Sequence, residues 1–362
     1  MMASNIDGVH FICANTDAQS LNDLENATIL QLGGTLTKGL GAGANPEVGR
    51  QAALEDKERI AQVLEGADMV FITAGMGGGT GTGGAPVIAE VAKQMGILTV
   101  GVVTRPFSFE GRKRMAIADA GIAALKERVD SLIIVPNEKL MQVLGKEMTV
   151  INAFKQANDV LFGAVQGITD LIMLDGLINV DFADVRTVMA EMGMAMMGTG
   201  EASGTDRAKV AAEGAIKCPL LEDINLQGAK GILVNITSGY DLTLGEFEDV
   251  GDTIRSFADE DATIIVGSVF EPELEDQLRV TVVATGLRGV AAKTGPRGVV
   301  VDNASARRTA SGDIDYGRLD KPTINRRSTT AADGSTARKM DINADPEMDF
   351  LDVPAFLRKQ AD

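Results

Sequence analysis

A glycine-rich loop between an apolar run and a helical segment constrains this chain more than any other feature. Residues 75–84 read GMGGGTGTGG, follow the apolar run 69–74 and precede the helical stretch 85–93. Glycines let backbone amides close around a phosphate, threonine hydroxyls add donors, and the helix start contributes its positive dipole end. A merely flexible connector is the alternative, but the position between strand and helix argues against it. The loop therefore predicts an α/β fold with a phosphate-binding site.

The first half of the chain alternates short apolar runs with helical segments. The runs lack two-residue alternation, which is typical of strands buried on both faces of a parallel sheet. We expect strands at residues 9–14, 28–32, 69–74, 99–104 and 132–135, and helices at about 47–65, 84–95, 112–128 and 138–144. This order predicts a Rossmann-like α/β domain over residues 1–148.

A long amphipathic helix follows this domain. Apolar side chains recur there at three- and four-residue steps, in one stripe formed by Val150, Phe154, Ala157, Leu161, Ala164, Ile168 and Leu171. A helix over residues 149–173 would span roughly 37 Å. We expect this central segment (149–177) to lead into a second α/β domain at 178–287, with strands at 231–236, 263–269 and 279–285.

Charge and composition exclude several classes of protein. The net charge is −17, and residues 1–287 alone carry 21 basic and 40 acidic side chains. An acidic body without Trp is a poor binder of DNA or RNA. Two Cys and one His exclude a disulfide framework and a His-rich metal site. Because no apolar run approaches the roughly 18 residues of a membrane span and the start does not resemble a signal peptide, we expect a cytoplasmic protein without membrane insertion.

The last part of the sequence differs in composition from the rest. Residues 288–344 are rich in Arg, Ala, Ser, Thr, Asp and Gly, which predicts a flexible linker. Residues 345–362 then contain a small apolar cluster, formed by Phe350, Leu351, Val353, Pro354, Phe356 and Leu357. An apolar cluster at the end of a tether is typical of a docking peptide that binds a partner protein. Folding back onto the chain's own body is the alternative.

The glycine loop leaves more than one ligand open when read alone. No G-x-x-x-x-G-K-[ST] motif occurs, which excludes a P-loop NTPase. Gly79, Gly81 and Gly84 satisfy the dinucleotide fingerprint. A carboxylate that binds the ribose is expected at the end of the next strand, but Thr104, Arg105 and Pro106 stand there instead. An NAD(P)-dependent oxidoreductase therefore remains a weaker alternative, without a Tyr-x-x-x-Lys pair after either Tyr240 or Tyr316.

Several motifs in the same order resemble one protein family. Residues 77–83 (GGGTGTG) look like the signature loop of the tubulin superfamily. Further matching stretches are residues 15–18 (NTDA), 37–50 (TKGLGAGANPEVGR), 106–115 (PFSFEGRKRM), 179–186 (NVDFADVR) and the C-terminal peptide. Together they resemble the FtsZ family of bacterial cell-division GTPases over essentially the whole chain. The resemblance implies a GTP-hydrolysing protein that polymerises head to tail and assembles the division ring at midcell, with membrane-tether and regulatory division proteins binding its C-terminal peptide.

The resemblance also implies the nucleotide-binding residues. They are Thr16, Ala42, Gly43, Ala44, Gly77, Gly78, Gly79, Thr80, Gly81, Thr82, Gly83, Glu110, Arg114, Asn137, Phe154, Asn158 and Asp159. Within this set Ala42–Ala44 contact the γ-phosphate, Glu110 the ribose, and Phe154 and Asp159 the guanine. The expected ligands are GTP or GDP with Mg²⁺ bridging the phosphates, and no dedicated protein metal cage. Read alone, Glu110 and Arg114 lie four residues apart on a helix, which also fits a surface ion pair.

Asn179, Asp181 and Asp184 follow the central helix and open the next one. Two carboxylates three residues apart can face the same way, although Asp at a helix start is often only a cap. A helix of about 37 Å separates them from the glycine loops. The resemblance implies that they polarise water at the nucleotide of a stacked subunit, so that hydrolysis is completed in trans in an open filament. A tubulin-like scaffold that polymerises without hydrolysis is the alternative.

In one respect the sequence departs from the family pattern. FtsZ relatives begin with a strand and a glycine-run loop for the α- and β-phosphates, whereas this sequence starts where the resemblance places the end of the first helix. That strand belongs between the strands at 9–14 and 69–74. Each backbone group left unpaired in a buried position there costs about 1–3 kcal/mol. We therefore expect residues 1–362 to bind GTP poorly and to misfold or aggregate, and the natural product to carry a further N-terminal strand and glycine run.

Overall fold

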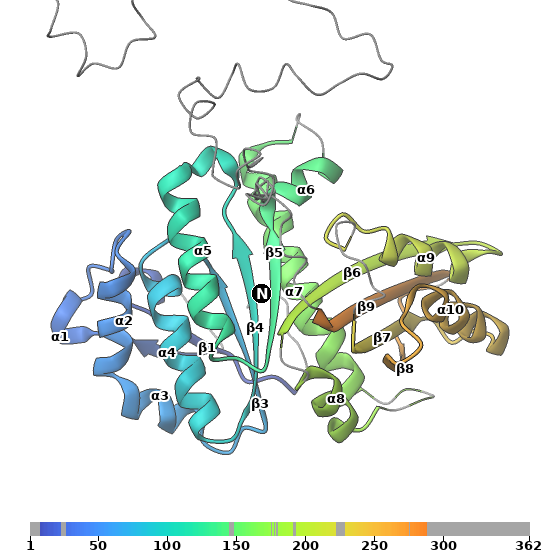
Figure 1. Ribbon diagram of the computed structural model, residues 1–362, viewed down its shortest axis with the longest axis horizontal. Coiled ribbons are helices and arrows are strands. Elements are labelled where there is room, and N and C mark those ends of the chain that lie inside the picture. Colours follow the sequence, from blue (N-terminus) through green and yellow to red (C-terminus); the bar gives the residue numbers. More distant parts are fainter. Residues whose placement is uncertain are drawn as a thin grey trace, which may run out of the picture. The chain divides into compact units, whose positions relative to one another are not determined.

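The strands in the described part of the chain form two separate sheets (Figure 1). The computed structural model describes residues 8–287 except 23–26, 145–147, 175, 177, 179, 191–192, 222–228 and 275. The expected linker (288–344), the expected docking peptide (345–362) and Asn179 lie outside the described residues.

The larger sheet has seven strands in the order β3-β4-β5-β6-β9-β7-β8. The strands are β3 (Met69–Gly75), β4 (Leu98–Arg105), β5 (Ser131–Pro136), β6 (Gly193–Ser203), β7 (Gly231–Ser238), β8 (Thr263–Phe270) and β9 (Gln277–Leu287). β3, β4, β5 and β6 pair in parallel with one another in that order, and β7 pairs in parallel with β8, whereas β9 is antiparallel to both β6 and β7. The expected parallel sheet of the first domain is confirmed for β3, β4 and β5, whereas the strands expected at 9–14 and 28–32 form the separate smaller sheet. β6 and β9 join β3–β5 to the second half.

Strand β6 has no counterpart among the expected strands. Its sequence, GMAMMGTGEAS, contains few β-branched or aromatic residues. A Cβ atom on Gly198 or Gly200 would collide with the carbonyl oxygen of Ala215 or Ala211 in helix α9 (Arg207–Ile216). Helix α9 packs so closely on β6 that glycines are required at these positions. Because glycine is uncommon in strands, the sequence of this segment did not predict one.

The smaller sheet consists of β1 (Ile12–Asn15) and β2 (Thr28–Gln31), which are parallel. The strand expected at 9–14 therefore begins three residues later and ends one residue later. Among the described strands, β1 pairs only with β2, and β3 pairs only with β4.

The helix expected at 47–65 is two helices, α2 (Pro46–Glu55) and α3 (Lys57–Leu64). The break falls at Asp56, whose carboxylate accepts a hydrogen bond from the Gly33 amide at 2.7 Å and pairs with Arg59 at 2.9 Å. Holding this nearly buried carboxylate against Gly33 ends the first helix. The short helix α1 (Gly34–Thr37) follows Gly33 directly.

Helix α4 (Thr80–Gln94) begins four residues before the expected position. Gly81, Gly83 and Gly84 thus belong to its first turns. A Cβ atom on Gly83 would collide with the carbonyl oxygen of Pro46 at the start of α2. Part of the glycine loop is therefore helix, and its glycines allow two helices to approach closely. Helix α5 (Arg112–Lys126) lies beside α4, and α6 (Asn137–Leu144) follows β5 (Figure 1).

The central helix is confirmed as α7 (Val150–Met173), 24 residues long, which corresponds to about 36 Å. The Thr149 side chain caps it by accepting a hydrogen bond from the Asn152 amide. Most of the predicted stripe is buried in a core shared with β4, β5, β7 and β9. The stripe leaves this core at its first turn, where Val150 and Phe154 are 58% and 41% exposed. Val150 is therefore open to solvent, and Phe154 packs edge-on against Phe107 instead of entering the core.

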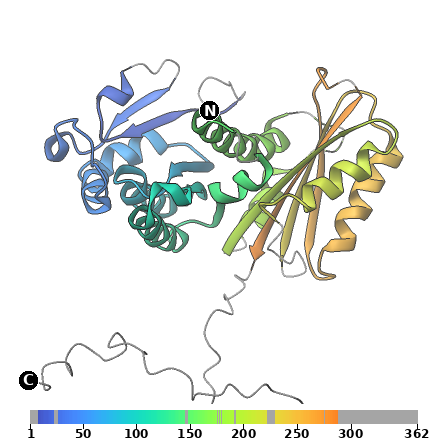
Figure 2. The same ribbon diagram turned by 90° about the horizontal axis from the view of Figure 1, so that it is seen from above.

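Helices cover both faces of the second half of the sheet (Figure 2). Helices α9 and α10 (Leu244–Phe257) share an apolar core with β7 and β9. On the other face, α7 and α8 (Phe182–Met189) contribute to the central core. None of the helices in the described part of the chain is long and apolar enough to span a membrane.

Candidate functional site

The two glycine-rich segments predicted from the sequence meet in space. The Gly79 amide donates a hydrogen bond to the Gly43 carbonyl oxygen at 2.9 Å. A Cβ atom on Gly79 would lie 2.5 Å from that oxygen and 2.9 Å from the Ala42 Cβ. Any side chain at position 79 would therefore separate the segments. Gly43 and Ala44 are exposed beside the start of α4.

The conformation of the glycine loop is fixed by its own hydroxyls. Gly77 has φ +103° and donates its amide hydrogen to the Thr82 Oγ1 at 2.9 Å. The Thr80 and Thr16 hydroxyls are 2.6 Å apart and join the start of α4 to the end of β1. Thr82 and Thr16 are buried. The geometry therefore gives Thr82 and Thr16 roles in shaping the loop.

The start of helix α4 is electrostatically suited to an anion. Its first turn contains no acidic residue, and its N-cap is Gly79, without a side-chain cap. Free amides and the helix dipole both favour a negative group at such a position. The aliphatic part of Arg114 packs here, because a Cβ atom on Gly77 would lie 2.7 Å from the Arg114 Cγ. The structure thus brings a cation from α5 to the glycine loop.

Glu110 is engaged in local contacts. Its carboxylate accepts a hydrogen bond from the Phe107 amide at 2.9 Å and lies 3.1 Å from the Arg114 Nε. The Glu110 side chain is 11% exposed, and that of Arg114 is 52% exposed. The ion pair read from the sequence spacing is therefore present, and Arg114 retains an open face.

Three phenylalanines gather beside these loops. The buried ring of Phe107 stacks on Phe109 at 5.0 Å and meets Phe154 edge-on at 5.3 Å. Phe109 and Phe154 are largely exposed, whereas Phe107 supports both. Asn158 and Asp159 lie exposed one turn along α7. Phe154 was expected at this site and Phe109 was not, although the alternation of Phe107 and Phe109 in PFSFE is visible in the sequence.

Asn137 is buried with an unused hydrogen-bond acceptor. It is 3% exposed at the end of β5, and within the described part of the chain its Oδ1 has no partner. Next to it, the Glu138 carboxylate accepts a hydrogen bond from the Ser108 amide at 3.0 Å. That contact joins Ser108, which lies between Phe107 and Phe109, to the start of α6. A buried free acceptor is well suited to a ligand donor.

Asp181 and Asp184 lie at the other end of α7. Both are exposed, and Asp181 occupies the N-cap position of α8 without a side-chain capping bond. Its backbone carbonyl instead accepts from the Asp184 amide at 2.9 Å. The capping alternative therefore does not describe Asp181, and both carboxylates are open to solvent. The structure does not bring them to the glycine loops, as the length of α7 predicted.

Known proteins resemble this chain along its length. The GTPase domain model of the Tubulin/FtsZ family matches residues 3–145, and the C-terminal domain model of the FtsZ family matches residues 193–288. The cell division protein FtsZ of Pseudomonas aeruginosa is 62% identical over 100% of this chain and 93% of its own length. The Coxiella burnetii protein of the same name is 58% identical over 99% and 92%. The chain belongs to the FtsZ family.

Solved structures agree with this assignment. An FtsZ dimer from M. jannaschii is 47% identical with a TM-score of 0.73, covering 75% of this chain and 79% of that one. CetZ2 from Haloferax volcanii, solved as a GTPgS-bound protofilament, covers 77% and 84% with a TM-score of 0.63. At 20% identity it shows a shared fold only. As an FtsZ-family member the chain is a GTP-binding, GTP-hydrolysing cell-division protein, which decides against the oxidoreductase alternative.

Proposed function

We propose that this chain binds GTP on the surface formed by the glycine loops and hydrolyses it where a second copy stacks head to tail. The observation that carries the proposal is the pair of uncommitted carboxylates, Asp181 and Asp184, at the opposite end of α7 from the loops. A helix of about 36 Å keeps them from the chain's own nucleotide. A stacked subunit removes that separation.

Each group at the site has a definite part in this proposal. Backbone amides around Gly43, Gly78 and the start of α4 bind the phosphates. Phe154 stacks on the guanine, Asp159 and Asn158 accept its N–H groups, and Arg114 neutralises phosphate charge. Asp181, Asp184 and Asn179 of the stacked copy hold and polarise the attacking water. A carboxylate that orients water near its proton is a common general base.

Mg²⁺ fits this site as an ion held by the nucleotide. Within the described residues, no group of three or more His, Cys, Asp and Glu is able to hold a metal. We expect the phosphate oxygens of the nucleotide to be the main ligands of the ion. When bound, Mg²⁺ neutralises the charge that develops on the transferred phosphate.

Exposed apolar side chains at both ends of α7 support head-to-tail stacking. Near the glycine loops, Leu40 is 86% and Ile151 81% exposed. At the other end, the ring of Tyr240 lies 5.5 Å from Phe270, close to Ser268, whose amide bonds to the carbonyl of Ile178. Leu244 is 82% exposed on the same C-terminal half. Two different apolar patches give a heterologous contact, which propagates into an open filament.

The trans assignment is tested by complementation. Asp184→Ala, made in a version that carries the expected N-terminal strand and glycine run, is expected to keep GTP binding and to lose most phosphate release. Gly79→Ala is expected to lose GTP binding, because its Cβ meets the Gly43 carbonyl, while Asp184 stays intact. A mixture of the two is expected to release phosphate faster than either alone.

The matched control is Glu260→Ala, which removes an exposed carboxylate elsewhere and leaves turnover unchanged. Loss of GTP binding in Asp184→Ala would contradict the trans assignment. Filaments of the unmodified chain that form without phosphate release would favour the scaffold alternative.

We further propose that residues 345–362 dock on a membrane-tether protein at the midcell ring in the cytoplasm. The apolar cluster after a polar linker supports this assignment. Many tails along one filament give avidity to a weak single contact. Phe356→Ala is expected to abolish recruitment to tether-coated vesicles and to leave GTP turnover unchanged. Equal recruitment of the variant and the unmodified chain would remove the tail from this role.

A further inference from the structure

The segment between α7 and α8 is held on strand β8 by two hydrogen bonds to one serine. The Ser268 amide donates to the Ile178 carbonyl oxygen at 3.3 Å, and the Ile178 amide donates to the Ser268 Oγ at 3.3 Å. Ser268 is 2% exposed, whereas Ile178 is 42% exposed. A side chain as exposed as that of Ile178 fixes its backbone only weakly by packing. The two hydrogen bonds to a buried partner therefore determine where the Ile178 backbone lies.

Strand β8 also contacts the segment on both sides of Ile178. A Cβ atom on Gly267, the residue before Ser268, would lie 2.7 Å from the Val180 Cγ2. A Cβ atom on Gly176 would collide with the Ser268 carbonyl oxygen. Val180 is nearly buried in the central core. The segment thus rests directly on two adjacent residues of β8, so that a change at either residue is transmitted to it.

The residues held in this way lie next to the groups assigned to hydrolysis. Ile178 and Val180 flank Asn179 in the sequence, and Asp181 follows directly. Asp181 is exposed and makes no side-chain capping bond with α8. An exposed carboxylate without such a bond depends on the backbone for its direction. The contacts that fix Ile178 and Val180 therefore also fix where the Asp181 carboxylate is presented.

Ser268 acts on this segment from inside the protein. Its burial keeps the hydroxyl away from any nucleotide or attacking water, so it is not a catalytic residue. The same strand ends at Phe270, whose ring lies 5.5 Å from Tyr240 in the proposed stacking surface. Strand β8 thus supports both a residue expected to contact the stacked copy and the segment that carries the carboxylates.

We propose that Ser268 is a positioning residue for hydrolysis in trans, because it holds Ile178 so that Asn179 and Asp181 meet the nucleotide of the stacked copy. This inference rests on the trans hydrolysis proposed above. A misplacement of about 1 Å can cost roughly a hundredfold in rate. Loss of the hydroxyl is therefore expected to lower turnover and to leave GTP binding, at the opposite end of α7, unchanged.

The test compares valine with threonine at position 268, since the two side chains have nearly the same shape and only threonine has a hydroxyl. Both variants are made in the version that carries the expected N-terminal strand and glycine run. Ser268→Val is expected to lower kcat for phosphate release roughly tenfold, with KM and the sedimented filament fraction unchanged. Ser268→Thr is expected to retain most of the turnover. Equal turnover of the two variants, at whatever level, would overturn the proposal.

Hydrogen exchange measures the bond itself. The Ile178 amide is expected to exchange at least about threefold faster in Ser268→Val than in Ser268→Thr, because valine removes its acceptor. The control is Ser256→Ala, which removes an exposed hydroxyl of α10 and is expected to change neither exchange at Ile178 nor turnover. Equal exchange of the Ile178 amide in the two variants at position 268 would overturn the proposal.

Mixing experiments separate this inference from the trans hydrolysis on which it rests. Gly79→Ala supplies an intact segment but binds no GTP, so adding it to Ser268→Val is expected to raise phosphate release. A double variant with Gly79→Ala and Ser268→Val is expected to give no rise. If Gly79→Ala rescues Asp184→Ala but not Ser268→Val, the role of Ser268 is overturned and trans hydrolysis stands. If it rescues neither, trans hydrolysis is contradicted, and the role of Ser268 falls with it.

Discussion

Strands β7 and β3 have similar sequences and very different surroundings. β7 reads GILVNITS and is buried at every residue, whereas β3 reads MVFITAG and is fully buried only at Ile72. β7 lies between β8 and β9, but β3 has β4 on one side only among the described strands. The amino-acid pattern predicts an interior strand at both positions. Burial is therefore decided by the number of neighbouring strands, which the pattern does not contain.

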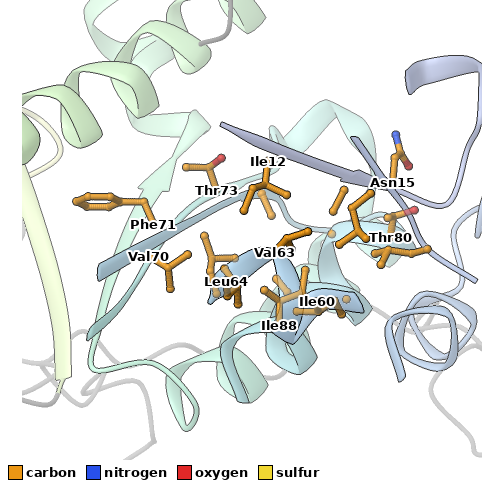
Figure 3. A pocket seen from close by; sticks show the side chains of 18 of the residues that line it. Ile12, Asn15, Ile60, Val63, Leu64, Val70, Phe71, Thr73, Thr80 and Ile88 are labelled. Atoms are coloured by element: carbon orange, nitrogen blue, oxygen red, sulfur yellow. The ribbon is translucent and has the colours of Figure 1, made fainter. Parts of the chain in front are cut away.

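The two halves of the chain that contain β7 and β3 also differ in how completely their apolar residues are buried. In the second half, helices cover both faces of the sheet and the apolar residues of β7 and β9 are completely buried. In the first half, a cavity of about 330 Å³, lined mostly by apolar side chains, separates β1 from β3 (Figure 3). Val70 and Phe71 of β3 are therefore only partly buried. We expect the second half to hold most of the stability of the described fold.

The largest expected change in the free energy of unfolding comes from removing a buried arginine in the second half, and the matched control is an arginine near the surface of the first half. Arg207 in α9 is 5% exposed, with Asp241 and Glu246 each at 2.6 Å. Arg207→Ala leaves these carboxylates without their partner and is expected to lower the free energy of unfolding by about 3–5 kcal/mol. Arg105 pairs with Asp119 near the surface, so Arg105→Ala is expected to cost about 1 kcal/mol or less. Urea denaturation measures both, and equal losses would contradict the contrast.

The next largest change in the free energy of unfolding is expected for an isoleucine in the second half, compared with a matched isoleucine in the first half. Ile236 of β7 is 0% exposed, and Ile29 of β2 is 46% exposed. Ile236→Ala creates a cavity and is expected to cost about 2–5 kcal/mol. Ile29→Ala removes atoms that are already half in water and is expected to cost about 1 kcal/mol or less. If Ile29→Ala destabilises the chain as much as Ile236→Ala, the first half is packed as tightly as the second.

The smallest expected change in the free energy of unfolding depends on pH and concerns Asp170. Burial and the nearby Glu271 raise the pKa of Asp170, on α7, to about 6. The folded state therefore favours the protonated form, and stability falls as the pH rises from the unfolded value near 4 to about 6. Asp170→Asn is expected to be more stable than the unmodified chain by roughly 1 kcal/mol at pH 7, after allowance for solvent screening, and similar at pH 4. Denaturation at both pH values measures this.

Glu246 changes the free energy of unfolding with pH in the direction opposite to Asp170. Its hydrogen bonds with Arg207 lower its pKa to about 2. It therefore contributes stability above its usual pKa near 4.5, which is lost as the pH falls toward 2.

The prediction for Asp170 has its own contradicting outcome. An Asp170→Asn variant that is less stable than the unmodified chain at pH 7 would show that the Asp170 carboxylate contributes a favourable charge interaction.

The sequence by itself determined the local elements and their chemistry. Continuous apolar runs predicted the parallel strands, and the three- and four-residue spacing predicted α7, because both depend on residues close in the chain. The strand–glycine–helix order predicted the anion-binding loop for the same reason. The separation of Asp184 from that loop followed from the length of one helix.

Only the tertiary structure decided what depends on distant partners. The break at Asp56 requires Gly33, the helical start at Thr80 requires a close approach of Gly83 to Pro46, and β6 requires glycines beneath α9. The contact between Gly43 and Gly79 and the pairing of β3 with β4 are likewise properties of the assembled chain. A residue's preference is local, whereas its burial and hydrogen-bond partner are set by segments that the backbone brings beside it.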